Sequence, residues 1–386
     1  MQIKEVKCKI ISDSRNEDTV EVTIDTNVGK FTASSPNGKS KGKHETKPYK
    51  KTIEEDVLAL EKLSDYFSSE YIDKFGDLRR IEDIVKGHIG GNTQLALEYA
   101  ALKALAKEQE KQVWQLINPK ANKIPRLLGN VIGGGLHSEF IDDKRPDFQE
   151  FLLSPKSNSA IESFKILKES KEELERLLRD KDAKFKGKKN DENAWMTSLN
   201  EREVLDILNK LDISTGVDIA AAGFYKRKKY HYKNPMLDRT AEEQLMYISN
   251  LIKNLRILYI EDAFDEDDFE SFAKLLSRHP RSLIVGDDLT VTNYKRLEKA
   301  IQMKSINALI IKPNQNGSLV EVARVVELAK KHNIKTIFSH RSGETMENIL
   351  SDIAFGFGAD FIKCGITGDV REVKVNRMIE IKEALK

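Results

Sequence analysis

Five short apolar runs in the second half of the chain each end in a side chain that can bind a metal, move a proton or hold an anion. These side chains are Glu261, Asp287, Lys312, His340 and Lys363. Successive members stand about 25 residues apart, the length of one strand, one helix and two short loops. The spacing therefore predicts a series of strand–helix units, each with a reactive residue at the end of its strand.

The apolar runs before these residues are continuous rather than alternating, as in 283–286 and 308–311. Parallel strands read this way because helices cover both faces of their sheet. When such units close into a barrel, the carboxyl ends of the strands open on one face, where active sites lie. We therefore expect a (β/α)8 barrel with the reactive residues around its mouth.

The first third of the chain has a different pattern. Residues 1–34 alternate apolar and polar positions, which is typical of antiparallel strands. Helical spacing runs from 52 to about 86 and again from 94 to 117, before Asn118 and Pro119. A length of 386 residues fits two domains. We expect an α/β protein in which an N-terminal α+β domain over 1–120 caps a barrel over 121–386.

Three carboxylates stand at the ends of predicted strands: Asp218, Glu261 and Asp287. Converging carboxylate oxygens, completed by water or substrate, are typical of a magnesium site. Alternatively, each carboxylate pairs with a lysine or caps the following helix. Their matching positions at strand ends favour the metal.

Two further positions indicate proton transfer and anion binding. Lys312 follows four aliphatic residues, so burial is expected to lower the pKa of its amine and make it a base. The alternative is a surface lysine or an ion-pair partner. The turn 339–344 offers the Arg341 guanidinium and the Ser342 hydroxyl beside His340, a set that suits phosphate or carboxylate.

The composition excludes several classes of protein. The 64 basic and 62 acidic residues give a net charge of +2, so no overall field favours nucleic acid or membrane. No apolar run approaches the roughly 18 residues of a membrane span, and charges fill the N-terminus where a signal peptide needs an apolar stretch. Cys8 and Cys364 lack the spacing of a metal site. We expect a cytoplasmic protein with a small-molecule substrate.

Several strings of the chain resemble those of the enolase family. They are residues 260–262, 285–293, 311–319, 339–345 and 361–363. Fainter similarities place 12–22 as the family's opening strand, 36–42 as its serine loop and 149–151 as a glutamate-bearing strand. Because the order and spacing of the strings also fit, the chain is identified as a member, and an enolase-type barrel is the implied fold.

The resemblance implies a lyase of glycolysis and gluconeogenesis, phosphopyruvate hydratase, which converts 2-phosphoglycerate reversibly to phosphoenolpyruvate. It implies one structural Mg²⁺ on Asp218, Glu261 and Asp287, and a second that arrives with the substrate. Lys312 would remove the proton from C2, and Glu192, with Glu150 beside it, would protonate the leaving hydroxyl. The other implied site residues are His340 near the leaving group and, for the substrate, His137, Gln149, Arg341, Ser342, Lys363 and Ser40. A homodimer or higher homo-oligomer is implied as well.

Several neighbours of these residues depart from the family pattern. Asn193 and Ala194 stand where the family has two glycines, and Pro313 follows the implied base. Lys39 takes the place of a small residue, and the usual arginine-bearing string after Lys363 is missing, although Arg371 can partly replace it. Two alternatives therefore stay open: a lyase acting on another phosphorylated hydroxy-acid, or a protein that binds a ligand or partner without turnover.

Overall fold

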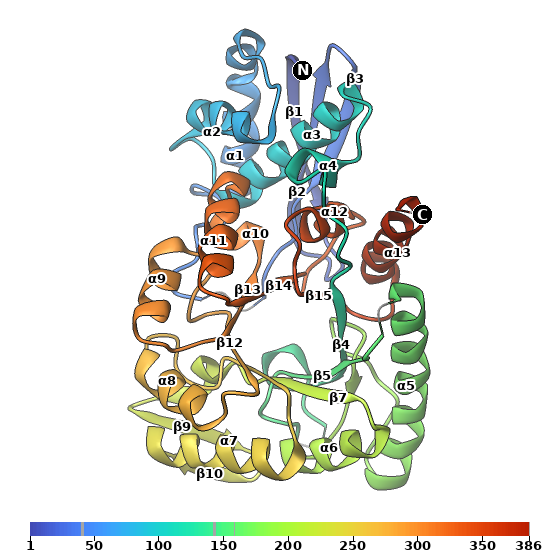
Figure 1. Cartoon of the computed structure of the whole chain (residues 1–386), viewed down its shortest axis with the longest axis vertical. Helices are drawn as coiled ribbons and strands as arrows, with labels where there is room; N and C mark the ends of the chain where they lie inside the picture. The colour runs from blue at the N-terminus through green and yellow to red at the C-terminus, as the bar shows by residue number, and fades with distance from the viewer. Residues whose placement is uncertain (40–41, 142–143, 158, 386) are drawn as a thin grey trace.

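A nine-stranded sheet curls into a barrel at the centre of the second part of the chain (Figure 1). The computed structural model describes residues 1–39, 42–141, 144–157 and 159–385. The sheet closes because β15 pairs with β4, which leaves the short β6 outside the ring. Its strands are β4 (Arg126–Gly133), β5 (Glu150–Ser154), β6 (Trp195–Met196), β7 (Ser214–Asp218), β11 (Tyr259–Glu261), β12 (Leu283–Gly286), β13 (Ala308–Ile311), β14 (Lys335–Ser339) and β15 (Phe361–Lys363).

Helices surround this barrel, as the strand–helix spacing predicts. Reactive residues fall at or directly after the ends of β7, β11, β12, β13, β14 and β15. The helices are α5 (Ala160–Lys181), α6 (Glu201–Leu208), α7 (Ala241–Leu255), α8 (Phe269–Arg278), α9 (Tyr294–Gln302), α10 (Pro313–Asn316), α11 (Leu319–Lys331), α12 (Ile349–Gly356) and α13 (Asp369–Ala384). A small antiparallel sheet of β8 (Tyr225–Lys226), β9 (Lys229–Lys233) and β10 (Met236–Arg239) precedes α7.

One barrel strand departs from the expected parallel arrangement. β5 is antiparallel to both of its neighbours, β4 and β7. Its start, not its end, therefore lies at the mouth, beside the last residue of β7. The strand register pairs Glu150 with Asp218, and so brings a residue that opens a strand into the ring of strand ends.

The N-terminal part is an antiparallel sheet with helices packed on it, and α3 contacts β2 and β3. Two predicted helices are each broken in the structure. Residues 52–86 divide because 71–72 leave the helix to pair with Met1 and Gln2. Residues 94–117 divide because Glu110 adopts a φ of 52°. The elements are β1 (Ile3–Ser12), β2 (Asp18–Thr26), β3 (Gly29–Ser34), α1 (Ile53–Lys62), α2 (Leu78–Val85), α3 (Gly91–Glu108) and α4 (Val113–Ile117), with 3₁₀ turns at Ser64–Ser69 and Phe75–Asp77.

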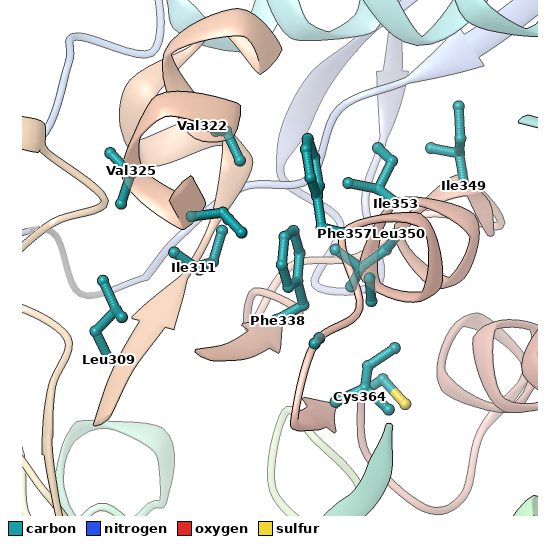
Figure 2. Packing of buried hydrophobic residues seen from close by; sticks show 14 of the residues in the cluster. Leu309, Ile311, Val322, Val325, Phe338, Ile349, Leu350, Ile353, Phe357 and Cys364 are labelled. Carbon is teal, nitrogen blue, oxygen red and sulfur yellow. The ribbon is translucent and has the colours of Figure 1, made fainter. Parts of the chain in front are cut away.

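Alternate residues of each barrel strand serve two separate cores. Ala308 and Ile310 of β13 join a cluster that fills the barrel, whereas Leu309 and Ile311 face the surrounding helices. Figure 2 shows this outer layer, where Phe338 of β14 stacks on Phe357 with ring centroids 5.9 Å apart. This alternation is what a filled barrel requires.

The outer cluster continues without a break from β1 to α13. The division of the chain at residue 120 therefore stays a prediction. Among the described residues, no helix combines the length and apolarity that crossing a membrane takes. Cys8 and Cys364 are both buried free thiols, and burial raises the pKa of Cys364 to about 12.

A buried glutamate between α6 and α7 makes stability depend on pH. Glu201 accepts a hydrogen bond from the Tyr247 hydroxyl at 2.7 Å, while its second oxygen is buried without a partner among the described residues. Burial raises the pKa of Glu201 from its ordinary 4.5 to about 7. The folded state thus holds this proton more tightly than the unfolded chain, so the free energy of unfolding falls as pH rises from about 4.5 to about 7.

Replacing Glu201 with glutamine is expected to remove this dependence. Glutamine keeps the acceptor for Tyr247 and carries no charge at any pH. We expect the Glu201→Gln variant to gain on the order of 3 kcal/mol in unfolding free energy over the wild type at pH 8, and almost nothing at pH 4. Urea unfolding at both pH values measures the difference. An equal effect at both would show that the carboxyl does not titrate in this window.

Candidate active site

Strand register gathers the carboxylates at one end of the barrel. Asp218 is paired in register with Glu261 on one side and with Glu150 on the other. All three are buried, and the ammonium of Lys363 lies among them. Its Nζ is 2.9 Å from Glu261, 3.2 Å from Asp218 and 3.2 Å from Glu150. Burial alone would lower the pKa of Lys363, but these three carboxylates together raise it far above its ordinary value.

Asp287 lies next in the ring and is paired with the implied base. Its Oδ2 accepts a hydrogen bond from Lys312 Nζ, and its Oδ1 accepts one from the Gln315 amide at 2.8 Å. The sequence-based expectation of a lowered pKa for Lys312 is wrong for this arrangement. Burial is the largest single influence and does lower it, but Asp287 and Glu261 more than offset the effect, so the pKa of Lys312 is raised.

The predicted trio Asp218, Glu261 and Asp287 suits a divalent cation. Glu261 Oε1 is buried with no hydrogen-bond partner among the described residues, which leaves a ligand atom available. Burial and the neighbouring Asp218 raise the pKa of Glu261 to about 8. Crowded, buried carboxylates of this kind are stabilised by a hard cation. Here the ammonium groups of Lys363 and Lys312 partly supply that positive charge.

A neighbouring acidic group has a structural role instead. Asp262, Asp287 and Asp288 bring ligand atoms within 4.8 Å of one another. Both oxygens of Asp262, however, accept hydrogen bonds from backbone N–H groups, those of Asp287 at 3.0 Å and Asp288 at 2.7 Å. Asp262 therefore holds the turn that presents Asp287.

Glu192 lies in a loop between α5 and α6 and lines the same cavity as Lys312. Asn130 of β4 donates to its Oε2 at 3.0 Å. Its Oε1 lies 3.6 Å from His137 Nδ1 and 3.7 Å from His340 Nε2. Both ring nitrogens are buried without a partner among the described residues. The three atoms leave room for a hydroxyl or water to bridge them.

The protonation of this cluster follows from burial. Burial lowers the pKa of His137 and, together with Arg371, takes that of His340 well below its ordinary value. Both rings are therefore neutral near pH 7. Burial alone would raise the pKa of Glu192, but His340, His137, Arg371 and the hydrogen bond from Asn130 together hold it below its ordinary value.

The loop that carries Glu192 keeps its shape despite the missing glycines. Asn193 adopts a φ of 60°, a left-handed conformation that asparagine tolerates far better than alanine. Ala194 does not have to adopt it. Pro313, the other departure beside the site, is also accommodated, because it stands in the first turn of α10, where no backbone donor is needed.

Arg341 and Ser342 lie together at the edge of the same mouth. The Arg341 guanidinium forms a two-pronged contact with Glu45 at 3.0 and 3.2 Å and donates to Asn314 at 3.0 Å. The Ser342 hydroxyl accepts from Arg15 at 2.7 Å and from the backbone N–H of Lys39 at 2.9 Å. N-terminal residues thus complete the turn that is predicted to bind an anion.

Arg371 has a larger part than its sequence position indicates. Its side chain is fully buried and donates to the carbonyls of Arg341 and Ser342. It also lies 2.7 Å from His340 Nδ1. A guanidinium can only donate, so neutral His340 must carry its proton on Nε2, facing Glu192. The sequence does not indicate this role clearly, because the family's arginine-bearing string after Lys363 is missing. A glycine-rich turn stands in its place, and Arg371 follows that turn.

The pocket that Lys312 and Glu192 line is nearly closed in this structure. Lys39 Nζ donates to Asp191 at 2.6 Å. This contact joins the N-terminal segment that carries Lys39 to the loop that carries Glu192. The cavity between them measures about 10 Å³, room for one water. Lys312, Glu192, Lys363, His340, Arg341, Ser342, His137, Gln149 and Glu150 all line it. Ser40, the remaining predicted residue, lies outside the described residues.

Known proteins share this architecture. The family model described as the enolase C-terminal TIM barrel domain matches residues 121–386. The chain is 35% identical to the enolase of Methanosphaera stadtmanae, over 99% of this chain and 97% of that protein. It is 34% identical to the enolases of Pyrobaculum aerophilum, over 100% and 97%, and of Thermoplasma acidophilum, over 100% and 99%. The barrel match and the full-length similarity show that this chain belongs to the enolase family.

Proposed function

We propose that this chain is a hydro-lyase that dehydrates 2-phosphoglycerate reversibly to phosphoenolpyruvate. The observation that carries the proposal is the pair Lys312 and Glu192, which both line one cavity. Removing a proton from one carbon and a hydroxyl from the next requires a base and an acid placed in this way. The similarity to enolases over the whole chain supports the same reaction.

In this proposal Lys312 removes the proton from C2. That proton is a weak acid, so the charge that develops on the neighbouring carboxylate has to be stabilised. Mg²⁺ on Asp218, Glu261 and Asp287 would supply much of that stabilisation, with a second Mg²⁺ arriving with the substrate. Lys363 adds a fixed positive charge. Lys312 must itself be neutral to act, so its ion pair with Asp287 has to loosen in the active state.

Glu192 donates the proton that releases the hydroxyl, and Glu150 lies beside it. His137 and His340, neutral near pH 7, both face Oε1 of Glu192. In this proposal they orient the leaving hydroxyl. In this structure the pKa of Glu192 is lowered in spite of burial, so Glu192 has to take up its proton when the substrate binds. Gln149 completes this side of the pocket, and Ser40 is proposed to contact the substrate from above.

Arg341 and Ser342 hold the phosphate. Glu45 now occupies the Arg341 guanidinium, and the Lys39–Asp191 pair closes the mouth. An anionic substrate would displace both contacts, because it offers Arg341 and Lys39 a more highly charged partner. Opening of the segment that carries Lys39 is therefore part of substrate binding.

A coupled assay tests this function directly. Purified protein with 2-phosphoglycerate and Mg²⁺ is expected to produce phosphoenolpyruvate, read by its absorbance, and a chelator is expected to stop the reaction. Restored Mg²⁺ should recover it. A correctly folded protein that binds Mg²⁺ yet forms no phosphoenolpyruvate would refute the proposal. A faster reaction with another phosphorylated hydroxy-acid would correct the substrate.

We also propose that the protein acts in the cytoplasm as a homodimer or higher homo-oligomer, without a membrane or nucleic-acid partner. The balanced charge and the two free buried thiols support the compartment and the lack of such partners. Light scattering on the eluting protein at several concentrations measures the assembly. A mass of 44.0 kDa throughout would correspond to a monomer and refute the oligomer.

A further inference from the structure

A second cavity lies at the end of the barrel opposite the mouth. It measures about 850 Å³ and is formed where β4, β7, β11 and β12 begin and where the reversed β5 has ended. The residues that line it fall at 126, 156, 214, 252–253, 256–258 and 278–282. Neither the proposed reaction nor its substrate reaches this end of the barrel.

The lining of this cavity is strongly basic. Six cationic side chains contribute to it: Arg126, Lys156, Lys253, Arg256, Arg278 and Arg281. No aspartate or glutamate is among the described residues that line it. The only one of the six with a carboxylate within 4.0 Å, among the described residues, is Arg278, whose guanidinium lies 3.9 Å from Glu242. In a chain whose overall charge is only +2, this is a concentrated positive field.

Arg126 shows that the charge is built into the fold. Among the described residues its guanidinium donates to neutral oxygens alone, those of Ser154 and the Pro155 carbonyl, at 3.2 to 3.3 Å. It also lies over the Phe361 ring, 5.2 Å from the ring centroid. Its Nε is buried with no partner among the described residues. Burial without a counter-ion lowers the pKa of Arg126. A guanidinium kept in this way is costly for the protein alone, and a bound anion would offset the cost.

We infer that this cavity binds a small anion with several linked phosphates. Arginine matches phosphate oxygens in pairs, and six cations around one hollow suit a chain of phosphates better than a single one. Nucleic acid is disfavoured, since binding of single strands uses aromatic side chains for stacking and no Phe, Tyr or Trp is among the described residues that line the cavity. Inorganic oligophosphate and a nucleoside triphosphate share the required chemistry.

Calorimetric titration of the full chain with tripolyphosphate, at about 50 mM salt to limit screening, tests the inference. The wild type is expected to show saturable binding. The Lys156→Glu/Lys253→Glu variant reverses two exposed, unpaired charges of the lining and should weaken binding about tenfold or more. The control variant Lys4→Glu/Lys86→Glu carries the same net charge on exposed residues of the N-terminal part, and should bind within about twofold of the wild type.

The active site is a second place where phosphate could bind, and Arg341→Gln separates the two. This variant should keep tripolyphosphate binding, and Lys156→Glu/Lys253→Glu should keep the dehydration rate. ATP binding tighter than tripolyphosphate would identify a nucleotide as the ligand, and the reverse would identify inorganic oligophosphate. No saturable binding, equal losses in both double variants, loss in Arg341→Gln, or binding of single-stranded RNA alone would each overturn the inference.

Discussion

Lys312→Ala is expected to lower the turnover of 2-phosphoglycerate by about 10³-fold or more, within the range that general-base catalysis contributes. Alanine has no group to accept the C2 proton, and no other amine is in contact with Asp287 among the described residues. The Michaelis constant should change far less than the turnover number, because Arg341, Ser342 and Lys363 still hold the substrate. Steady-state kinetics at saturating Mg²⁺ measures both.

Lys295→Ala is the matched control, since Lys295 is exposed on α9 and should leave the rate unchanged. Loss of Lys312 also leaves Asp287 without its ammonium partner, so the variant should bind Mg²⁺ at least as well as the wild type. A Lys312→Ala variant that turns over at the normal rate would show that another group is the base.

Glu192→Gln is expected to lower turnover by a similar factor, roughly 10² to 10⁴, for a different reason. Glutamine keeps the hydrogen bond from Asn130 but has no proton for the leaving hydroxyl. Proton removal at C2 does not need Glu192, so exchange of that proton with deuterated water should continue without elimination. NMR of recovered 2-phosphoglycerate reads this exchange.

The two variants therefore give opposite patterns, because Lys312→Ala should abolish exchange together with turnover. Glu201→Gln is the control for replacing a buried glutamate. This variant should retain full activity, because the Glu201 side chain contacts Tyr247 of α7 and lies away from the mouth. If Glu192→Gln lost exchange as well, Glu192 would have to act before or with proton removal, and the assignment of acid and base would fail.

Most of the barrel and its ring of reactive residues could be predicted from the sequence. Continuous apolar runs ending in Glu261, Asp287, Lys312 and Lys363 correspond to β11, β12, β13 and β15. This worked because a buried strand and the polar residue that ends it are local features of the chain. The similarity to enolases confirms the family and the fold.

The features that could not be predicted depend on contacts between distant segments. The pKa of Lys312 follows from Asp287, 25 residues away, and a local argument from aliphatic neighbours gave the opposite sign. The role of Arg371 requires knowing that α13 begins beside His340. The helix predicted over 52–86 is broken at 71–72 by pairing with Met1 and Gln2. The helix predicted over 94–117 is broken by the left-handed backbone of Glu110. Hydrophobic periodicity indicates neither break.

The reversed direction of β5 has a consequence for how such a protein can diversify. In a strand–helix unit, the chain returns from one end of the barrel to the other through a helix of the outer layer. A change of length in that connection therefore disturbs the helical layer. The connection from β4 to β5 starts and finishes at the mouth, and its described residues contain no helix of the outer layer. Insertions between Gly134 and Gln149 can therefore reshape substrate choice while the barrel wall stays intact. Laboratory evolution aimed at new phosphorylated acids has its least constrained starting point in this connection.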